Sequence, residues 1–194
     1  MTKLTREDLM SLEQYAANRK SFREKVITHK KNRQLALTAH ATLYFEDRLT
    51  MQYQVQEMLR IERIFEAQGI QEELDAYNPL VPDGANWKAT FMIEYDKIDE
   101  CKQALAKLVG VEDKVWVQVN DFDGVWAIAD EDLDRETEGK TSSVHFLRFE
   151  LTEKMVAAVK SGAAISAGID HDYCREYVAP IPQNIRDSLA NDLQ

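Results

Sequence analysis

Residues 40–65, HATLYFEDRLTMQYQVQEMLRIERIF, form the stretch around which we expect the chain to fold. The pattern predicts a short strand over 42–45, a turn at 46–47 and a long helix over 49–68 that ends at Gly69, a residue type common just after helices. Apolar side chains recur on two sides of this helix. Because most surface helices carry one apolar stripe, a helix that is apolar on two sides is expected to be buried on both.

Five polar residues of this helix form the main part of our candidate site: Tyr53, Gln56, Glu57, Arg60 and Glu62. Residues three or four apart on a helix are neighbours, so one hydrogen-bonded network can link them. Inside a protein they need partners, because a buried unpaired charge is very costly. One interpretation is a structural network that holds the helix in register. The other is a polar pocket floor, in which Arg60 holds an anion and Glu57 or Glu62 accepts a proton.

The second half of the chain predicts the strands that would enclose such a pocket. Apolar residues predict strands over 88–95, 114–120, 125–129 and 143–151. Three polar residues of these strands are the candidate pocket walls: Glu94, Arg148 and Glu150. Residues 170–173 are expected to form a polar loop.

These elements define the expected organisation of the chain. Residues 1–33 are expected to form an N-terminal helical arm, and residues 34–194 a single domain. No repeat or low-complexity linker divides that domain. The fold class is therefore α+β, with a single mixed sheet, helices mainly on one face and the arm beside it.

Charge and hydropathy exclude several classes of protein. The net charge of −10 disfavours binding to nucleic acid or to an anionic membrane surface. No apolar run of 18 residues predicts a membrane span, and the N-terminus has no apolar signal core. The cytoplasm is therefore the expected location.

The charges are unevenly distributed, and this favours a homodimer. Residues 19–33 contain seven basic side chains and residues 121–138 contain eight acidic ones. The helix predicted over 13–31 has few apolar residues, mainly Phe22, Val26 and Ile27, so we expect these to bind a second subunit. The alternative is an arm that lies along its own sheet, with two solvated charged faces.

Metal and nucleophile motifs are lacking in the sequence. The four histidines do not form an H-x-x-x-H or E-x-x-H pair, and the cysteines do not form C-x-x-C. We therefore expect no metal and no cofactor. His145 is interpreted as a hydrogen-bonded core histidine, Cys101 as an inert buried thiol, and Cys174 as a loop cysteine.

Several long runs carry a resemblance to a known family: FEDRLTMQYQVQEMLRIERIFE, EELDAYNPLVPDG and SSVHFLRFEL. Over nearly its whole length the chain resembles the bacterial family catalogued as domain of unknown function 3501. Members tend to be encoded beside rubrerythrin-like proteins and iron–sulfur oxidoreductases. The resemblance implies an uncharacterised accessory or binding protein in redox defence, with an oxidoreductase as partner. The alternative is a small enzyme that uses the acid–base residues and Arg60 of the central helix.

Overall fold

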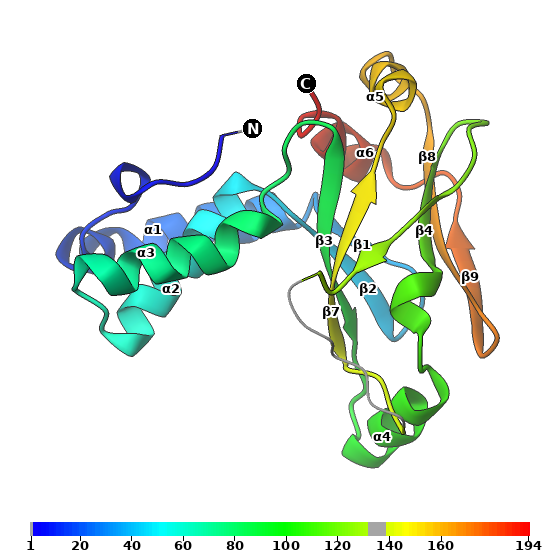
Figure 1. The fold of residues 1–194 in the computed structure, drawn as a ribbon, viewed down its shortest axis with the longest axis horizontal. Helices are drawn as coiled ribbons and strands as arrows, with labels where there is room; N and C mark the ends of the chain where they lie inside the picture. The colour runs from blue at the N-terminus through cyan, green and yellow to red at the C-terminus, as the bar shows by residue number, and fades with distance from the viewer. Residues whose placement is uncertain (1, 132–138) are drawn as a thin grey trace.

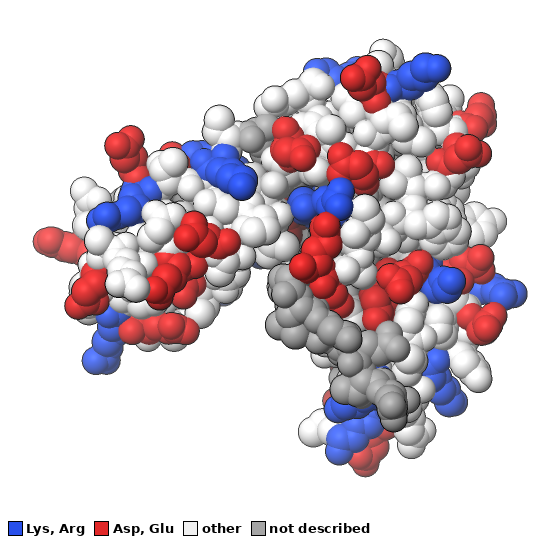
Figure 2. Space-filling model, in the orientation of Figure 1, with Lys and Arg blue, Asp and Glu red and all other residues white. Residues whose placement is uncertain are grey.

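Figure 1 shows the computed structural model, which describes residues 2–131 and 139–194. The fold is α+β, as expected. A body built on two sheets carries a helical arm on one side, and Figure 2 shows a notch between the arm and the body. No helix in the described residues is long and apolar enough to cross a membrane.

In the part of the chain that the structure describes, every strand of the body pairs with antiparallel neighbours. The first sheet runs in the order β1 (Gln34–Ala36), β2 (Ala41–Glu46), β3 (Asn86–Ile93), β7 (Val144–Glu150) and β6 (Ile128–Ala129). The second runs in the order β5 (Val125–Trp126), β4 (Val115–Val119), β8 (Ile165–His171) and β9 (Cys174–Val178). The expectation of one mixed sheet was therefore wrong.

The reason for two sheets lies in the stretch expected as one strand over 125–129. Its first part, β5, pairs with β4, and its second part, β6, pairs with β7. Between them the Ala127 N–H donates to the Val115 carbonyl (2.9 Å). The chain thus leaves one sheet and enters the other, which an alternating pattern cannot reveal because it reports faces and not partners.

The main core lies between the inner faces of the two sheets. Phe91 and Leu147 of the first sheet and Val117 of the second are at most 1% exposed. Helix α4 (Ile98–Lys107) lies at one end of this core, and α5 (Glu153–Lys160) and α6 (Gln183–Ala190) lie at the other (Figure 1). Pro182 is the N-cap residue of α6, and the Thr152 hydroxyl caps α5 by accepting from the Met155 N–H.

The arm has a second apolar core of its own. The helical arm of the structure is formed by α1 (Leu12–Lys30), α2 (Arg48–Glu62) and α3 (Ala67–Tyr77), so it includes more of the chain than the expected N-terminal arm of residues 1–33. Met51, Val55 and Leu59 of α2 are at most 4% exposed and cluster with Leu74 of α3. Since α2 contacts both α1 and α3, it is buried on two sides, but against helices instead of a sheet.

The central helix is shorter than the sequence pattern predicts. It ends at Glu62, because Arg63 adopts the left-handed conformation (φ 55°) that terminates a helix. Gly69, expected as the end, lies inside α3. A Cβ on Gly69 would lie 2.7 Å from Ile64 Cγ2, so glycine allows α3 to approach the turn that precedes it.

Candidate functional site

Glu57 is paired, but mainly with residues of α1 and not with its neighbours on α2. The Arg19 guanidinium donates to both of its oxygens (2.7 and 2.8 Å), and the Tyr15 hydroxyl donates at 2.6 Å. Arg60 is 41% exposed and lies 3.6 Å from Glu57. The hydrogen bond from Arg19 is the main reason that the pKa of Glu57 falls to about 2, so this carboxylate stays ionised at neutral pH.

The other predicted residues of α2 do not complete a pocket. Gln56 is fully buried, and its side chain accepts from the Met10 N–H (2.6 Å) and donates to the Met10 carbonyl (3.3 Å). This exchange fastens the segment before α1 to α2. Tyr53 lies against the Phe22 ring, and Glu62 is exposed.

The three predicted wall residues lie in the body, apart from the α2 residues. Glu94, exposed after β3, accepts a hydrogen bond from the Tyr44 hydroxyl (3.2 Å). On β7, Arg148 donates to Glu131 through two nitrogens (2.8 Å each) and to Glu150 (2.5 Å). The fold therefore separates the eight candidate residues into an arm group and a sheet group.

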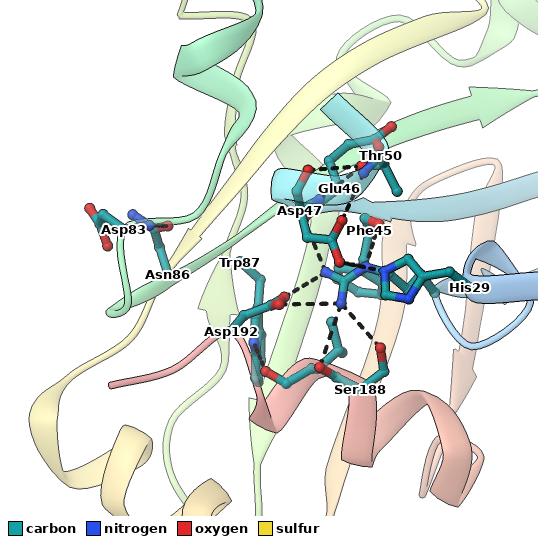
Figure 3. A network of polar contacts seen from close by, with 12 residues as sticks. His29, Phe45, Glu46, Asp47, Thr50, Asp83, Asn86, Trp87, Ser188 and Asp192 are labelled. Carbon is teal, nitrogen blue, oxygen red and sulfur yellow. Dashed lines mark hydrogen bonds and ion pairs between the residues drawn. The ribbon is translucent and has the colours of Figure 1, made fainter. Parts of the chain in front are cut away.

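A buried ionic network that sequence reasoning missed joins the arm to the body (Figure 3). Arg33, 2% exposed, donates to both oxygens of Asp192 (3.2 and 2.5 Å) beyond α6 and to the Phe45 carbonyl (2.9 Å). Asp47, the N-cap of α2, lies 3.4 Å from Arg33 and 2.5 Å from His29 at the end of α1. Arg33 looked like one member of a basic run, and only the fold surrounds it with carboxylates.

The pKa values of the two carboxylates in this network are shifted in opposite directions. Burial raises the pKa of Asp192 to about 6, although Arg33 opposes the shift. For Asp47, burial also acts to raise the pKa, but Arg33, the Thr50 N–H and His29 outweigh it and the pKa is lowered. Asp192 therefore stabilises the folded protein below its ordinary pKa of 3.8, and this contribution is lost as the pH rises through about 6.

Asp192→Asn is expected to remove this pH dependence, because the amide imitates the protonated acid and cannot titrate. From pH 4 to pH 7, the free energy of unfolding of the wild type should fall by roughly 2 kcal/mol relative to the variant. Urea unfolding at several pH values measures the difference. A constant gap between the two proteins across this range would contradict the assignment.

A pocket of about 470 Å³ opens between the β1–β2 turn, α4 and the β8–β9 hairpin. Ala104 of α4, Leu108 directly after this helix and Ile93 of β3 contribute apolar side chains to it. The polar groups come from all three elements and from the segment that follows β3: His40, Tyr95, Gln103, Lys107, Cys174 and Glu176. Apolar walls with a few convergent polar groups are typical of small-molecule sites.

Two of the polar side chains of this pocket, His40 and Tyr95, are held in place by each other. The rings of His40 and Tyr95 stack with centroids 4.0 Å apart and planes 9° apart, and His40 Nδ1 lies 2.9 Å from the Glu94 carbonyl. Burial raises the pKa of Tyr95, and burial followed by Glu176 raises that of Cys174. At neutral pH both groups keep their hydrogens, so they can donate hydrogen bonds but are poor nucleophiles.

Another hollow, of about 680 Å³, lies at the end of the arm away from the body. Its walls are mainly apolar, with Leu9, Leu59 and Ile70 among them, and its charged lining residues are the neighbours Arg6 and Glu7. We favour the smaller pocket as the candidate site, because there the polar groups converge from separate elements.

Two histidines lie away from this pocket's rim. His171, expected in a polar loop, belongs to β8; its Nε2 lies 3.0 Å from the Val109 carbonyl, and its Nδ1 accepts from the Tyr173 N–H (3.2 Å). His145 on β7 is fully buried. His145, Glu112 and Asp130 each offer one atom that could bind a metal ion, and these three atoms all lie within 4.8 Å of one another.

The fold and the pocket define an α+β protein of two antiparallel sheets, with a helical arm and a pocket beside α4. The chain belongs to the family described as protein of unknown function (DUF3501), which it matches over residues 3–193. A solved structure from Burkholderia pseudomallei K96243, described as a novel protein of unknown function, is 51% identical over 100% of both chains, with a TM-score of 0.94. No curated protein matches the chain.

Proposed function

We propose that this protein is a binding protein whose pocket beside α4 holds a small organic molecule. The observation that carries the proposal is the convergence of polar groups from three elements around an apolar floor. A volume of about 470 Å³ lies within the range of about 300–1,000 Å³ that is common for small-molecule sites.

The pocket's charges indicate the kind of ligand. Glu100 at its edge is paired with Lys97 (2.7 Å), and Arg175 with Asp170 (3.1 Å), so these charges are already balanced. Lys107 and Glu176 provide one further charge of each sign. The pocket therefore suits a small amphipathic molecule, neutral or zwitterionic, with a flat apolar part beside the stacked His40 and Tyr95 rings.

Several features favour binding over catalysis. General acid–base catalysis works best when the pKa of the catalytic group is near the working pH. Glu57, the strongest acid–base candidate of the central helix, is held near pKa 2 by Arg19, and Tyr95 and Cys174 have raised pKa values. The alternative of an enzyme built on α2 therefore has little physical support.

Ala104→Phe is expected to abolish ligand binding, because the ring would occupy the pocket. Ala106→Phe is the matched control, since Ala106 is an exposed residue of the same helix. A fragment library measured by NMR should shift the wild-type and Ala106→Phe amide signals around α4 and the β8–β9 hairpin. The same fragments should leave these signals unchanged in Ala104→Phe.

The experiment contradicts the proposal in two cases. One is that no fragment shifts the signals of the pocket in the wild type. The other is that the Ala104→Phe protein, folded by its circular dichroism spectrum, binds the fragments as the wild type does. Either result would return attention to protein–protein binding.

An accessory role beside an oxidoreductase is the finer part of the proposal, and it rests on the family resemblance. One surface suits a protein partner: Trp126 lies opposite Trp116, Trp116 opposite Gly168, and Gly168 opposite Tyr177, in a row across the second sheet. Trp126 is 49% and Tyr177 70% exposed. Exposed aromatic groups of this kind are common in protein interfaces.

The homodimer likewise stays a prediction, which sedimentation at several concentrations measures. The side chains expected to form its interface are partly used within the subunit. Val26 is 1% exposed, and Phe22 contacts both Tyr15 and Tyr53, whereas Ile27 is 43% exposed. Of the acidic stretch expected to face the arm, residues 132–138 lie outside the described part of the chain.

A further inference from the structure

The buried histidine of β7 is surrounded by oxygen atoms on both edges of its ring. His145 Nδ1 lies 2.6 Å from Asp130 Oδ2. Its Nε2 lies 2.9 Å from Thr141 Oγ1, 3.1 Å from the Ser142 carbonyl and 3.7 Å from Glu112 Oε2. His145, Thr141 and Glu112 are 0%, 1% and 6% exposed. Bulk water therefore cannot screen these charges.

Too few hydrogens are available for the atoms around Nε2. Carbonyl and carboxylate oxygens only accept, and a hydroxyl has one hydrogen to give. Thr141 Oγ1 also lies 3.1 Å from Glu112 Oε2, so its hydrogen can satisfy either that carboxylate or the ring. If Nδ1 carries the hydrogen that faces Asp130, the Nε2 lone pair points at other acceptors. When the Thr141 hydrogen faces Glu112, a positive species at Nε2, either a second proton or a metal ion, satisfies the ring and the oxygens around it together.

We propose that these residues form a binding site for a divalent first-row transition metal ion such as zinc. The ligands are Nε2 of His145, Oε2 of Glu112, Oγ1 of Thr141 and the carbonyl oxygen of Ser142. In a tetrahedral zinc site with bonds of about 2.0–2.1 Å, the ligand atoms lie about 3.3 Å apart. Four of the six distances among these atoms are given above, and at 2.9 to 3.7 Å they bracket that value.

The remaining features of the cluster suit the same ion. An imidazole nitrogen among the ligands favours zinc and its neighbours over magnesium or calcium. Asp130 occupies the place of the carboxylate that orients a metal-bound histidine through its other nitrogen. That carboxylate is itself held, because its Oδ1 accepts from the Phe146 N–H (2.9 Å).

The site would hold together segments that are far apart in the sequence. Glu112 comes from the 3-10 turn η3 (Val111–Lys114), Asp130 from the end of β6, and His145 from β7. The Thr141 N–H donates to the Leu105 carbonyl of α4 (3.2 Å). Since the ligands are buried, the ion has a structural role there, and the site does not depend on the ligand pocket.

Equilibrium dialysis against zinc, followed by elemental analysis, tests the site. The wild type and Glu153→Gln, a control at an exposed glutamate, should hold one zinc per chain and melt at a higher temperature with zinc than without. Asp130→Asn should weaken zinc binding about 10–100-fold, the usual effect of losing the orienting carboxylate. Glu112→Gln should weaken it at least as much.

A second measurement on the unmodified protein covers the case in which a variant does not fold. In nitrogen NMR of the histidine rings, the chemical shift of His145 Nε2 should change when zinc is added, while Nδ1 keeps its hydrogen. A wild type that holds no zinc would overturn the proposal in favour of a proton only. Zinc bound with the His145 signals unchanged would overturn it equally, because the ion would then lie elsewhere.

Discussion

Arg33→Met is expected to lower the free energy of unfolding by about 3–5 kcal/mol at pH 7, because it leaves buried carboxylates without their cation. Asp192 is 2% and Asp47 7% exposed, and both lie against the Arg33 guanidinium. The methionine has a similar volume, so the loss reports on charge more than on packing. Guanidinium unfolding followed by circular dichroism measures it.

Arg175→Met is the matched control for this substitution. Arg175 also pairs with two aspartates, Asp170 and Asp172 (3.1 Å each), but its side chain is 67% exposed. Water screens such pairs, so we expect a loss under about 1 kcal/mol. At pH 5 the loss for Arg33→Met should shrink, because Asp192, with a pKa of about 6, is then largely protonated. Equal losses for the two variants would show that Arg33 is not buried among charges.

Trp87→Ala is expected to cost a similar amount, about 3–5 kcal/mol, through the cavity that it leaves in the core. Trp87 of β3 is fully buried, and its Nε1–H donates to the Leu189 carbonyl of α6 (3.0 Å). The substitution therefore removes packing volume and also the bond that fastens the C-terminal helix to the first sheet. Thermal and denaturant unfolding should both shift.

Trp126→Ala removes a tryptophan of the same size from an exposed strand and serves as the control. Its side chain is 49% exposed, so no closed cavity results, and the loss should stay near 1 kcal/mol or less. If Trp87→Ala proves as mild as Trp126→Ala, the end of the body formed by α6 is not the closed core that its burial indicates.

The order and type of most elements could be predicted from the sequence. The helix α1 and the strands β2, β3, β4 and β7 all correspond to local patterns. These patterns depend on capping residues and on the periods of helices and strands, which are properties of neighbouring residues. The class α+β followed from them.

The sequence could not show which elements pack against one another, because that is set by contacts between residues far apart in the chain. The strand pattern over 125–129 did not show that the chain changes sheets there. The helix period of 49–68 did not show the break at Arg63, since a left-handed conformation in arginine has no sequence signal. The two apolar sides of α2 indicated double burial, but not that α1 and α3 would provide it.

The candidate sites divide in the same way. The sequence by itself determined that Glu57 needs a partner, because a carboxylate on a mostly apolar helix is costly alone. Only the tertiary structure decided that the partners are Tyr15 and Arg19. Likewise, Glu112, Asp130 and His145 have no ligand spacing along the chain, and the folding of η3, β6 and β7 against one another brings their ligand atoms within 4.8 Å. Spacing along the chain reports only the faces of one helix or strand, whereas a site built from several elements exists only after the core has brought them together.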